Sequence, residues 1–588
     1  MKEEKWILLN KKADFAALEQ ALEIDALTAR LLANRGVDTV EKAKAFYFGT
    51  PAELPSARLF KDGEACVSLL RQSLAAGEKI AVASDFDADG VFSGMILKQA
   101  LSGLGGTVRV YTPDRMSEGY GLNLRIVEEA AAWGAGVLLT CDNGIAAHEA
   151  VAAAGKCGMK VLITDHHEPP RDGIPQALAA VDPKQEDCPY PYKEICGAAV
   201  AFKLMQLLYR ELGRAEEELE ELIPYASIAT VTDVMPLAEE NRILVKEGLR
   251  LLQESRQPGL RAMLKVTELE GKPLTAYHLG FILGPCFNAA GRLETVETVQ
   301  RLLEARSLAE ALPFAERLKE LNNQRKELTN QGRRAAEEAI AREGLEKDRV
   351  LVVHLPEIHE SVAGIVAGRL REEYARPALV LTGTGDLIKG SGRSIEAYNM
   401  YEGLDRVKTL LDRFGGHAMA AGFSLKTENL AEFRRQLNEG CGLSDEDMKE
   451  TVRLDAVMKP EYATPERIRE WEELAPFGKG NDRPLFGQSS LKVCDMKVLG
   501  QSRNAVRLRF GTEAGFLYEG IWFGPAEQFE EDIRAALGEK ALTALERGQK
   551  SITMALAYEP MLHEWNGRTT VQFQIRHYRI LGADGRDG

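Results

Sequence analysis

The sequence predicts a multidomain α/β protein that ends in a small β-barrel, and three observations support this. Short apolar runs alternate with helix-like segments over residues 75–294, a pattern typical of a parallel α/β sheet. A second α/β pattern at 349–454 follows a long charged helix at 295–348, which Pro313 is expected to interrupt. The remainder, 455–588, contains five or more short strands with alternating apolar residues, which predicts a barrel such as an OB-fold.

Composition places the chain among large globular proteins. Its 588 residues are 28% charged and 45% hydrophobic, enough for several domains with their own cores. No apolar run reaches the ~20 residues of a membrane span, and the first residues lack a signal-peptide core. The eight cysteines form no C-x-x-C pair, which argues against a zinc ribbon and a redox dithiol. The sequence therefore predicts a cytoplasmic protein without membrane contact, and its net charge of −15 argues against a non-specific nucleic-acid coat.

The elements can be placed in order along the chain. Residues 1–74 are rich in alanine and leucine and are expected to be helical. Four apolar runs then predict strands at 78–84, 107–113, 136–144 and 160–167. In parallel sheets ligands bind beyond the carboxyl ends of the strands, so functional side chains are expected there.

Three carboxylates alternate within five residues at the end of the first predicted strand: Asp85, Asp87 and Asp89. Like charges this close raise one another's pKa unless a cation neutralises them. A helix N-cap is the alternative explanation, but a cap uses only one acid. The stretch therefore favours a hard divalent cation.

Further candidate ligands follow other apolar segments. Asp142 ends one predicted strand, His166 and His167 end another, and Asp233 follows the apolar segment 226–232. Carboxylates with imidazole and without thiolate suit Mn²⁺ or Mg²⁺, and the set suffices for two such cations, as in phosphoryl hydrolysis. Asp142 is expected to bridge the cations, with His166 as a ligand and His167 facing substrate; two structural histidines are the alternative for this pair alone. The predicted metal ligands are Asp85, Asp87, Asp89, Asp142, His166 and Asp233, and the predicted catalytic residues are Asp142, His166, His167 and Asp233.

In order and spacing, these motifs resemble the DHH phosphoesterase family, most closely its RecJ exonucleases. The resemblance rests on "DFDADG", "CDNG", "DHH", "TVTDVMPL", "PDRMSEGYGLN", "NAAGR", "KGSGRS", "GGHAMAAGF" and "LAPFGKGNDRPLF", which span about residues 80 to 490. It implies a DHH lobe, a connecting helix, a DHH-associated lobe and an OB-fold. It also implies a two-metal, 5′→3′ exonuclease specific for single-stranded DNA that releases 5′-mononucleotides in recombination and repair. Partners implied are single-strand-binding protein and a helicase; a monomer is expected because several domains already enclose a site.

The same motifs supply candidate substrate contacts. Arg115 and Tyr120 offer a cation and a stacking ring to a single-stranded nucleotide, although "EGYG" also fits a simple turn. The "KGSGRS" stretch offers backbone amides with Ser391, Arg393 and Ser394 to a terminal phosphate, and a glycine-rich turn is its alternative. The resemblance adds Asn288, Arg292, His359 and His417 to the predicted substrate contacts.

The chain departs from the family pattern at four positions, none a predicted metal ligand. Cys286 replaces the arginine of "PRxNAAGR", Ile358 and Ser361 replace Trp and Gly of "WHxGVxGIVA", and Ser84 replaces a glycine. Cys286 removes an expected phosphate contact, which leaves the strength of the 5′-phosphate preference open.

Two other functions stay open at this stage. One is a DHH phosphodiesterase for short oligonucleotides or cyclic dinucleotides, and the other is a non-catalytic replication scaffold. The predicted barrel favours a polymer substrate, which argues against the phosphodiesterase for short substrates. The intact set of candidate metal ligands argues against the non-catalytic scaffold.

Overall fold

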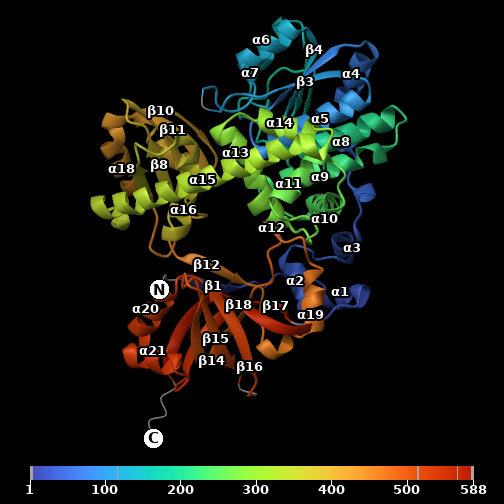
Figure 1. Cartoon of the computed structure of the whole chain (residues 1–588). Coiled ribbons are helices and arrows are strands. Elements are labelled where there is room, and N and C mark those ends of the chain that lie inside the picture. The colour runs from blue at the N-terminus through green and yellow to red at the C-terminus, as the bar shows by residue number, and fades with distance from the viewer. Residues whose placement is uncertain (1–3, 116, 513–514, 566, 584–588) are drawn as a thin grey trace. The chain divides into compact units, whose positions relative to one another are not determined.

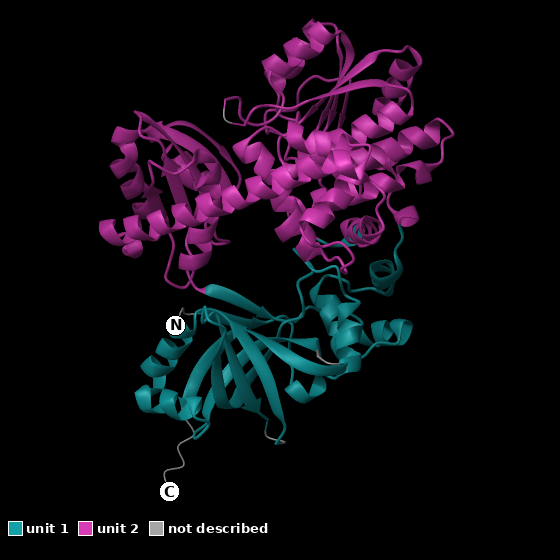
Figure 2. Cartoon of the chain, viewed as in Figure 1, with its two compact units in different colours: residues 1–50, 237–239, 450–588 teal, residues 51–236, 240–449 magenta. Residues whose placement is uncertain are grey.

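The chain forms two units, each assembled from separate stretches of sequence (Figure 2). The computed structural model describes residues 4–115, 117–512, 515–565 and 567–583. Unit 1 comprises residues 1–50, 237–239 and 450–588, and unit 2 comprises 51–236 and 240–449. Among the described helices, none has the length and apolar character needed to cross a membrane.

The first sheet of unit 2 is fully parallel, in the order β3-β2-β4-β5-β6 (Figure 1). Its strands are β2 (Lys79–Ser84), β3 (Thr107–Tyr111), β4 (Ala135–Cys141), β5 (Lys160–Thr164) and β6 (Ala179–Val181). Interior strand β2 is apolar on both faces, because Ile80 and Val82 enter one core while Ala81 and Ala83 enter another. The four predicted strands are therefore present, and the three-residue β6 is an addition.

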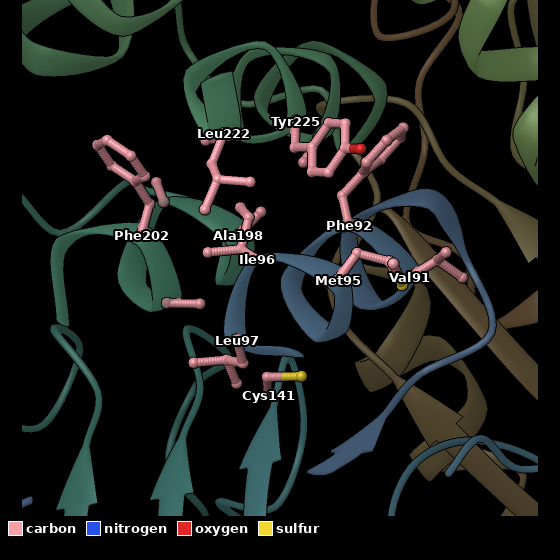
Figure 3. Packing of buried hydrophobic residues seen from close by; sticks show 14 of the residues in the cluster. Val91, Phe92, Met95, Ile96, Leu97, Cys141, Ala198, Phe202, Leu222 and Tyr225 are labelled. Carbon is pink, nitrogen blue, oxygen red and sulfur yellow. The ribbon is translucent and has the colours of Figure 1, made fainter. Parts of the chain in front are cut away.

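Three helices share a core on one face of this sheet. They are α5 (Ala88–Gly103), α8 (Gly197–Glu211) and α9 (Ile223–Thr232), and Figure 3 shows their apolar side chains converging. The rings of Phe92 and Tyr225 lie 5.2 Å apart, and Phe202 packs into the same cluster. This packing fixes the start of α5 and α8 and the end of α9. The apolar segment before Asp233 is thus a helix and not a strand, so this acid reaches the sheet edge from a helix C-terminus.

A single long helix links the two sheets of unit 2. After α14 (Glu297–Glu304), helix α15 (Leu308–Glu343) packs Leu318 into the first core and Ile340 into the second. The predicted interruption at Pro313 is wrong, because Pro313 lies within α15 and the break precedes Ser307, the N-cap. Proline there removes one helical hydrogen bond, which packing on both cores outweighs.

The second sheet is mixed, in the order β10-β11-β9-β8-β7, with only β7 and β8 parallel. Its strands are β7 (Leu351–His354), β8 (Ala378–Thr382), β9 (Leu387–Arg393), β10 (Leu411–Gly416) and β11 (Ala420–Lys426). Helix α16 (Glu360–Tyr374) packs against β8 and β9. The glycine-rich "KGSGRS" stretch therefore begins inside a central strand and not in a turn.

Unit 1 contains the predicted barrel. Antiparallel pairs and one parallel pair, β16 with β18, join the strands in the order β14-β15-β16-β18-β17, and β14 pairs again with β17 to close the ring. The strands are β14 (Phe486–Leu499), β15 (Ala505–Gly511), β16 (Leu517–Phe523), β17 (Ile552–Trp565) and β18 (Arg568–Ala583). Phe573 and Ile575 of β18 are buried in its core, as their alternation predicts.

The N-terminal segment packs with this barrel domain. It contains a strand, β1 (Glu4–Leu8), where the sequence predicts only helix, and β1 pairs in parallel with β12 (Glu450–Leu454). Arg35, just after α2 (Ala26–Asn34), forms a buried ion pair with Asp455 at 2.9 Å. Residues 1–50 thus share a core with 450–588, and removing the barrel would expose that core.

Candidate active site

The first two carboxylates lie at the carboxyl end of β2. Asp85 is fully buried and accepts a hydrogen bond from the Gly121 amide at 3.2 Å. Asp87 caps α5 by accepting from the Gly90 amide at 3.1 Å. Carboxylate oxygens of Asp85, Asp87 and Asp142 lie within 4.8 Å of one another, as expected for neighbouring parallel strand ends.

Asp142 lies at the centre of the cluster, directly after β4. Its φ of +60° is a left-handed conformation that ordinary residues rarely adopt. At Gly197, the first residue of α8, a Cβ would come within 2.7 Å of the Asp142 Cβ, so only glycine fits there. Oδ1 of Asp142 is 3.0 Å from Nε2 of His166, and the structure therefore brings both predicted residues together.

Asp165 positions the histidine pair. Its Oδ1 accepts hydrogen bonds from the His166 amide and from His167 Nδ1, both at 2.8 Å, while Oδ2 accepts from the Ile145 amide at 2.9 Å. Burial lowers the pKa of His166 to about 4, so its imidazole is neutral. Burial also opposes charge on His167, but the hydrogen bond and charge of Asp165 raise the pKa of His167 to about 9. The neutral ring can offer a lone pair to a cation, and the protonated ring cannot.

Two further acids approach His166. Asp233, the C-cap residue of α9, has its Oδ2 3.8 Å from His166 Nε2. Asp89 is closer, at 3.5 Å, but its two oxygens accept hydrogen bonds from the amides of Gly197 and Ala198 at 2.7 and 2.8 Å. Asp89 therefore also caps helix α8, a contact that the sequence did not predict.

The cluster can accommodate divalent cations. Burial, with neighbouring carboxylates, raises the pKa of Asp85 and Asp142 well above the usual range. Among the described residues, Oδ2 of Asp85 and Nδ1 of His166 are buried without a hydrogen-bond partner. Three sets of side chains have ligand atoms within 4.8 Å: Asp85, Asp87 and Asp142; Asp89, His166 and Asp233; and Asp142, His166 and His167. The first set is all carboxylate and the second has two carboxylates and one imidazole, and such donors are those that Mn²⁺ and Mg²⁺ prefer.

Arg115 and Tyr120 lie beside the carboxylates, held by Phe86. The Tyr120 hydroxyl donates to the Asp142 carbonyl at 2.6 Å, and it is 3.2 Å from His167 Nε2. The Arg115 guanidinium lies 4.9 Å from the centre of the Phe86 ring, and the Phe86 and Tyr120 rings are edge-on with their centroids 6.2 Å apart. The tyrosine ring remains half exposed, so it is available for stacking.

A group of arginines lies next to the acids: Arg115, Arg292, Arg325 and Arg393. Arg292 donates to the Ser361 carbonyl at 2.9 Å, and burial together with the other three arginines lowers the pKa of Arg292 to about 9. Within the described part of the chain, none of the four forms an ion pair with a carboxylate. Mutually repelling, partly buried guanidinium groups are typical of an anion site. Sequence reasoning missed Arg325, which lies on α15 and donates to Asn322 at 2.9 Å.

The backbone of the "KGSGRS" stretch is paired within the sheet. Its residues in β9 pair with β8 on one side and β11 on the other, so the expectation that its backbone binds a phosphate is wrong. Ser394 is buried and donates its hydroxyl to the Tyr398 carbonyl, which removes it from the surface. Ser391 and Arg393 both face Gly364 of α16, where a Cβ would lie 2.9 Å from the Arg393 guanidinium.

The remaining predicted contacts are spread over the two lobes of unit 2. Asn288 of α13 (Gly284–Leu293) accepts from the Ala88 amide at 2.8 Å and so supports the loop that carries the acids. His359 is exposed at the N-cap of α16, and exposed His417 accepts from the Met419 amide at 3.2 Å. Cys286 is buried against Asn322 of α15.

Comparisons with known proteins agree with this geometry. The N-terminal domain of the DHH family matches residues 79–231, the DHHA1 domain 347–442, and the RecJ OB domain 454–577. The single-stranded-DNA-specific exonuclease RecJ of Escherichia coli (strain K12) is 34% identical over 576 residues, which cover 94% of this chain and 96% of the relative. The enzyme of the same name from Bacillus subtilis (strain 168) is 32% identical over 564 residues, covering 95% of this chain and 69% of the relative.

Solved structures give the same result. A crystal structure of RecJ from Thermus thermophilus in complex with Mn²⁺ has a TM-score of 0.81 at 27% identity, covering 98% of this chain and 80% of that one. The predicted resemblance and fold class are thereby confirmed. With three matching domains in the family's order and identity above 30% along nearly the whole of a relative, the chain belongs to the RecJ family of DHH proteins.

Proposed function

We propose that this chain is a metal-dependent exonuclease that degrades single-stranded DNA from its 5′ end and releases 5′-mononucleotides. One observation supports this most strongly: a buried carboxylate–imidazole cluster lies beside arginines that have no carboxylate partner among the described residues. The acids suit two cations, and the arginines suit the phosphates of a strand. Membership of the RecJ family supplies the substrate class.

We assign the two cations to Asp85, Asp87, Asp142, His166 and Asp233. Asp142 belongs to two of the three ligand sets, which fits a bridging carboxylate. When bound, Mn²⁺ or Mg²⁺ would neutralise charge on the scissile phosphate and increase the acidity of the attacking water. Asp165 orients both histidines, and His167 presents a protonated ring suited to the negative charge of the phosphate.

The remaining residues position the strand. We assign Ser391, Arg393 and Arg292 to the terminal 5′-phosphate, and Arg115 and Tyr120 to the first nucleotide. Water then attacks the next phosphorus, and the bond to the 3′-oxygen of the terminal nucleotide breaks. The product is a 5′-mononucleotide, and the shortened strand keeps a new 5′-phosphate for the next cycle.

The setting of this activity is also a proposal. The barrel domain, which matches the RecJ OB domain, would hold the downstream strand and favour a polymer over a cyclic dinucleotide. We further propose a cytoplasmic monomer that works in recombination and repair beside single-strand-binding protein and a helicase.

Asp89 provides a first test, because we now propose that it acts as a cap and not as a ligand. Asp89→Ala should lower the free energy of unfolding of the Mn²⁺-saturated protein by about 1–2 kcal/mol, since two buried amides lose their acceptor. It should still bind two Mn²⁺ ions in a titration followed by electron paramagnetic resonance. Asp85→Ala is the matched control and should lose bound Mn²⁺. Loss of an ion in Asp89→Ala would show that Asp89 is a metal ligand after all.

Metal binding should weaken as the pH falls. The raised pKa values of Asp85 and Asp142 mean that these carboxyls keep protons at a higher pH than ordinary ones, and protons compete with the cation. His166, with a pKa of about 4, stays neutral and adds no competition. Isothermal titration with Mn²⁺ should show affinity rising from pH about 5.5 to about 8, with proton release that depends on buffer. Equal affinity across this range would contradict the assignment.

A further inference from the structure

We propose that Tyr277 and Phe281 form a stacking platform for bases downstream of the cleaved nucleotide. Tyr277 and Phe281 are 60% and 68% exposed, and exposed large apolar groups that lie together mark interaction sites. Their rings stack with centroids 5.0 Å apart and planes inclined by 22°. The pair presents a flat aromatic surface that any base can cover, because every base has a π-face. This inference rests on the proposed action on single-stranded DNA.

The platform belongs to the helix that leads into the active site. Residues 276–293 run without a break through α12 (Ala276–His278), a π-helical turn η4 (Leu279–Leu283) and α13 (Figure 1). Two glycines of this helix face the end of α9: a Cβ at Gly280 would lie 3.2 Å from Val231, and one at Gly284 would overlap Thr232. The ring pair is therefore anchored against the turn that ends at Asp233.

The helix also presents one continuous stripe of partly or fully exposed residues. Its members recur at the spacing of one helical face and are Tyr277, Phe281, Pro285, Asn288 and Arg292. Asn288 contacts the loop of the metal cluster, and Arg292 lies in the arginine group. At about 1.5 Å per residue, Phe281 lies about 10 Å from Asn288 along the helix axis. The stripe thus joins the platform to groups assigned to the phosphates.

The order along this stripe matches the polarity of the proposed reaction. A strand whose 5′-phosphate lies at Arg292 would pass the metal cluster beside Asn288 and then reach Phe281 and Tyr277 with its downstream bases. The platform would therefore contact only substrates longer than the first nucleotides. It would hold the strand in place between cycles without reading its sequence.

Oligonucleotide binding in EDTA tests this without requiring hydrolysis. Fluorescence anisotropy should show that Phe281→Ala and the double variant with Tyr277→Ala bind a 5′-phosphorylated oligothymidylate of about 12 nucleotides about 5- to 100-fold more weakly. Phe281→Trp should retain binding because it keeps a ring. A 5′-phosphorylated thymidine dinucleotide is too short to reach the platform, so all variants should bind it with the affinity of the wild type. Both residues are exposed, and thermal denaturation monitors the fold of each variant.

Abasic substrates identify the interaction as stacking. Abasic sites in the downstream part of the strand should weaken binding by the wild-type protein, yet cause little further loss in Phe281→Ala. Phe48→Ala, which removes an equally exposed ring from unit 1, is the matched control and should bind normally. Unchanged binding by the platform variants, an equal loss on the dinucleotide, or an equal loss in Phe48→Ala would overturn the proposal.

These outcomes are separable from failure of the proposed function. A wild-type protein that binds the oligonucleotide in EDTA but never degrades it with Mn²⁺ would refute the nuclease and leave the platform standing. If the wild-type protein degrades the oligonucleotide but the platform variants bind it normally, the platform is refuted and the nuclease stands.

Discussion

Asp142→Asn should reduce degradation of single-stranded DNA by about a thousandfold or more, equivalent to about 4 kcal/mol of transition-state stabilisation. The substitution keeps the size of the side chain but removes the negative charge at the centre of the cluster. Asp142 is the carboxylate shared by two ligand sets, so its loss should affect both cations. Single-turnover rates at saturating Mn²⁺ measure the effect.

The same variant should be more stable than the wild type when metal is removed. The pKa of Asp142 is raised in the folded protein, mainly by burial, so its ionised form destabilises the fold. Such a group favours folding at low pH, and this contribution is lost as the pH rises through the folded-state pKa. In EDTA at pH about 8, Asp142→Asn should therefore melt at a higher temperature than the wild type. Asp172→Asn, the same change at an exposed loop residue, should alter neither the rate nor the melting temperature.

Arg393→Ala should reduce transition-state stabilisation by about 2–5 kcal/mol on strands with a 5′-phosphate, which is the range for losing a desolvated charge pair. Arg393 is mostly buried, lies beside Arg115, and its guanidinium donates to the Gly392 carbonyl at 2.8 Å. The planar guanidinium can bind two phosphate oxygens at once, so Arg393→Lys should recover only part of the loss. Values of kcat/KM on phosphorylated and 5′-hydroxyl strands measure it.

The comparison between the two substrates decides what Arg393 recognises. The loss should be much smaller on 5′-hydroxyl strands, which lack the terminal dianion. Arg435→Ala is the matched control, because the Arg435 guanidinium is already paired with Glu432 and Glu439, both at 2.5 Å, and its removal should change little. Equal losses on both substrates would show that Arg393 does not read the strand end.

The strands and their functional ends could be predicted because their residues are locally distinctive. The apolar runs of β2, β4 and β5 each end in an acid or histidine, and parallel pairing brings those ends together without further information. Strand β6 lacks such a run, being only three residues long. Strand β1 exists because β12 pairs with it from far along the chain, which no local pattern reveals.

The corrections at the site have the same origin. "KGSGRS" has the composition of a turn, but pairing on both sides makes it a strand and occupies its amides. The role of Asp89 as a cap of α8 is hidden in the sequence because its partners, the amides of Gly197 and Ala198, are distant along the chain. Arg325 was missed since a charged helix such as α15 carries many arginines that face only water.

The product of the first cleavage tests the proposed 5′→3′ exonuclease activity most directly. The purified chain should be incubated with Mn²⁺ and a single strand labelled at its 5′ end, in parallel with the same strand labelled at its 3′ end and with a duplex. We expect that 5′ label appears at once as a mononucleotide, that 3′ label remains in progressively shorter strands, and that EDTA or duplex structure stops the reaction. Internal cuts, mononucleotides released first from the 3′ end, or equal activity in EDTA would contradict this expectation.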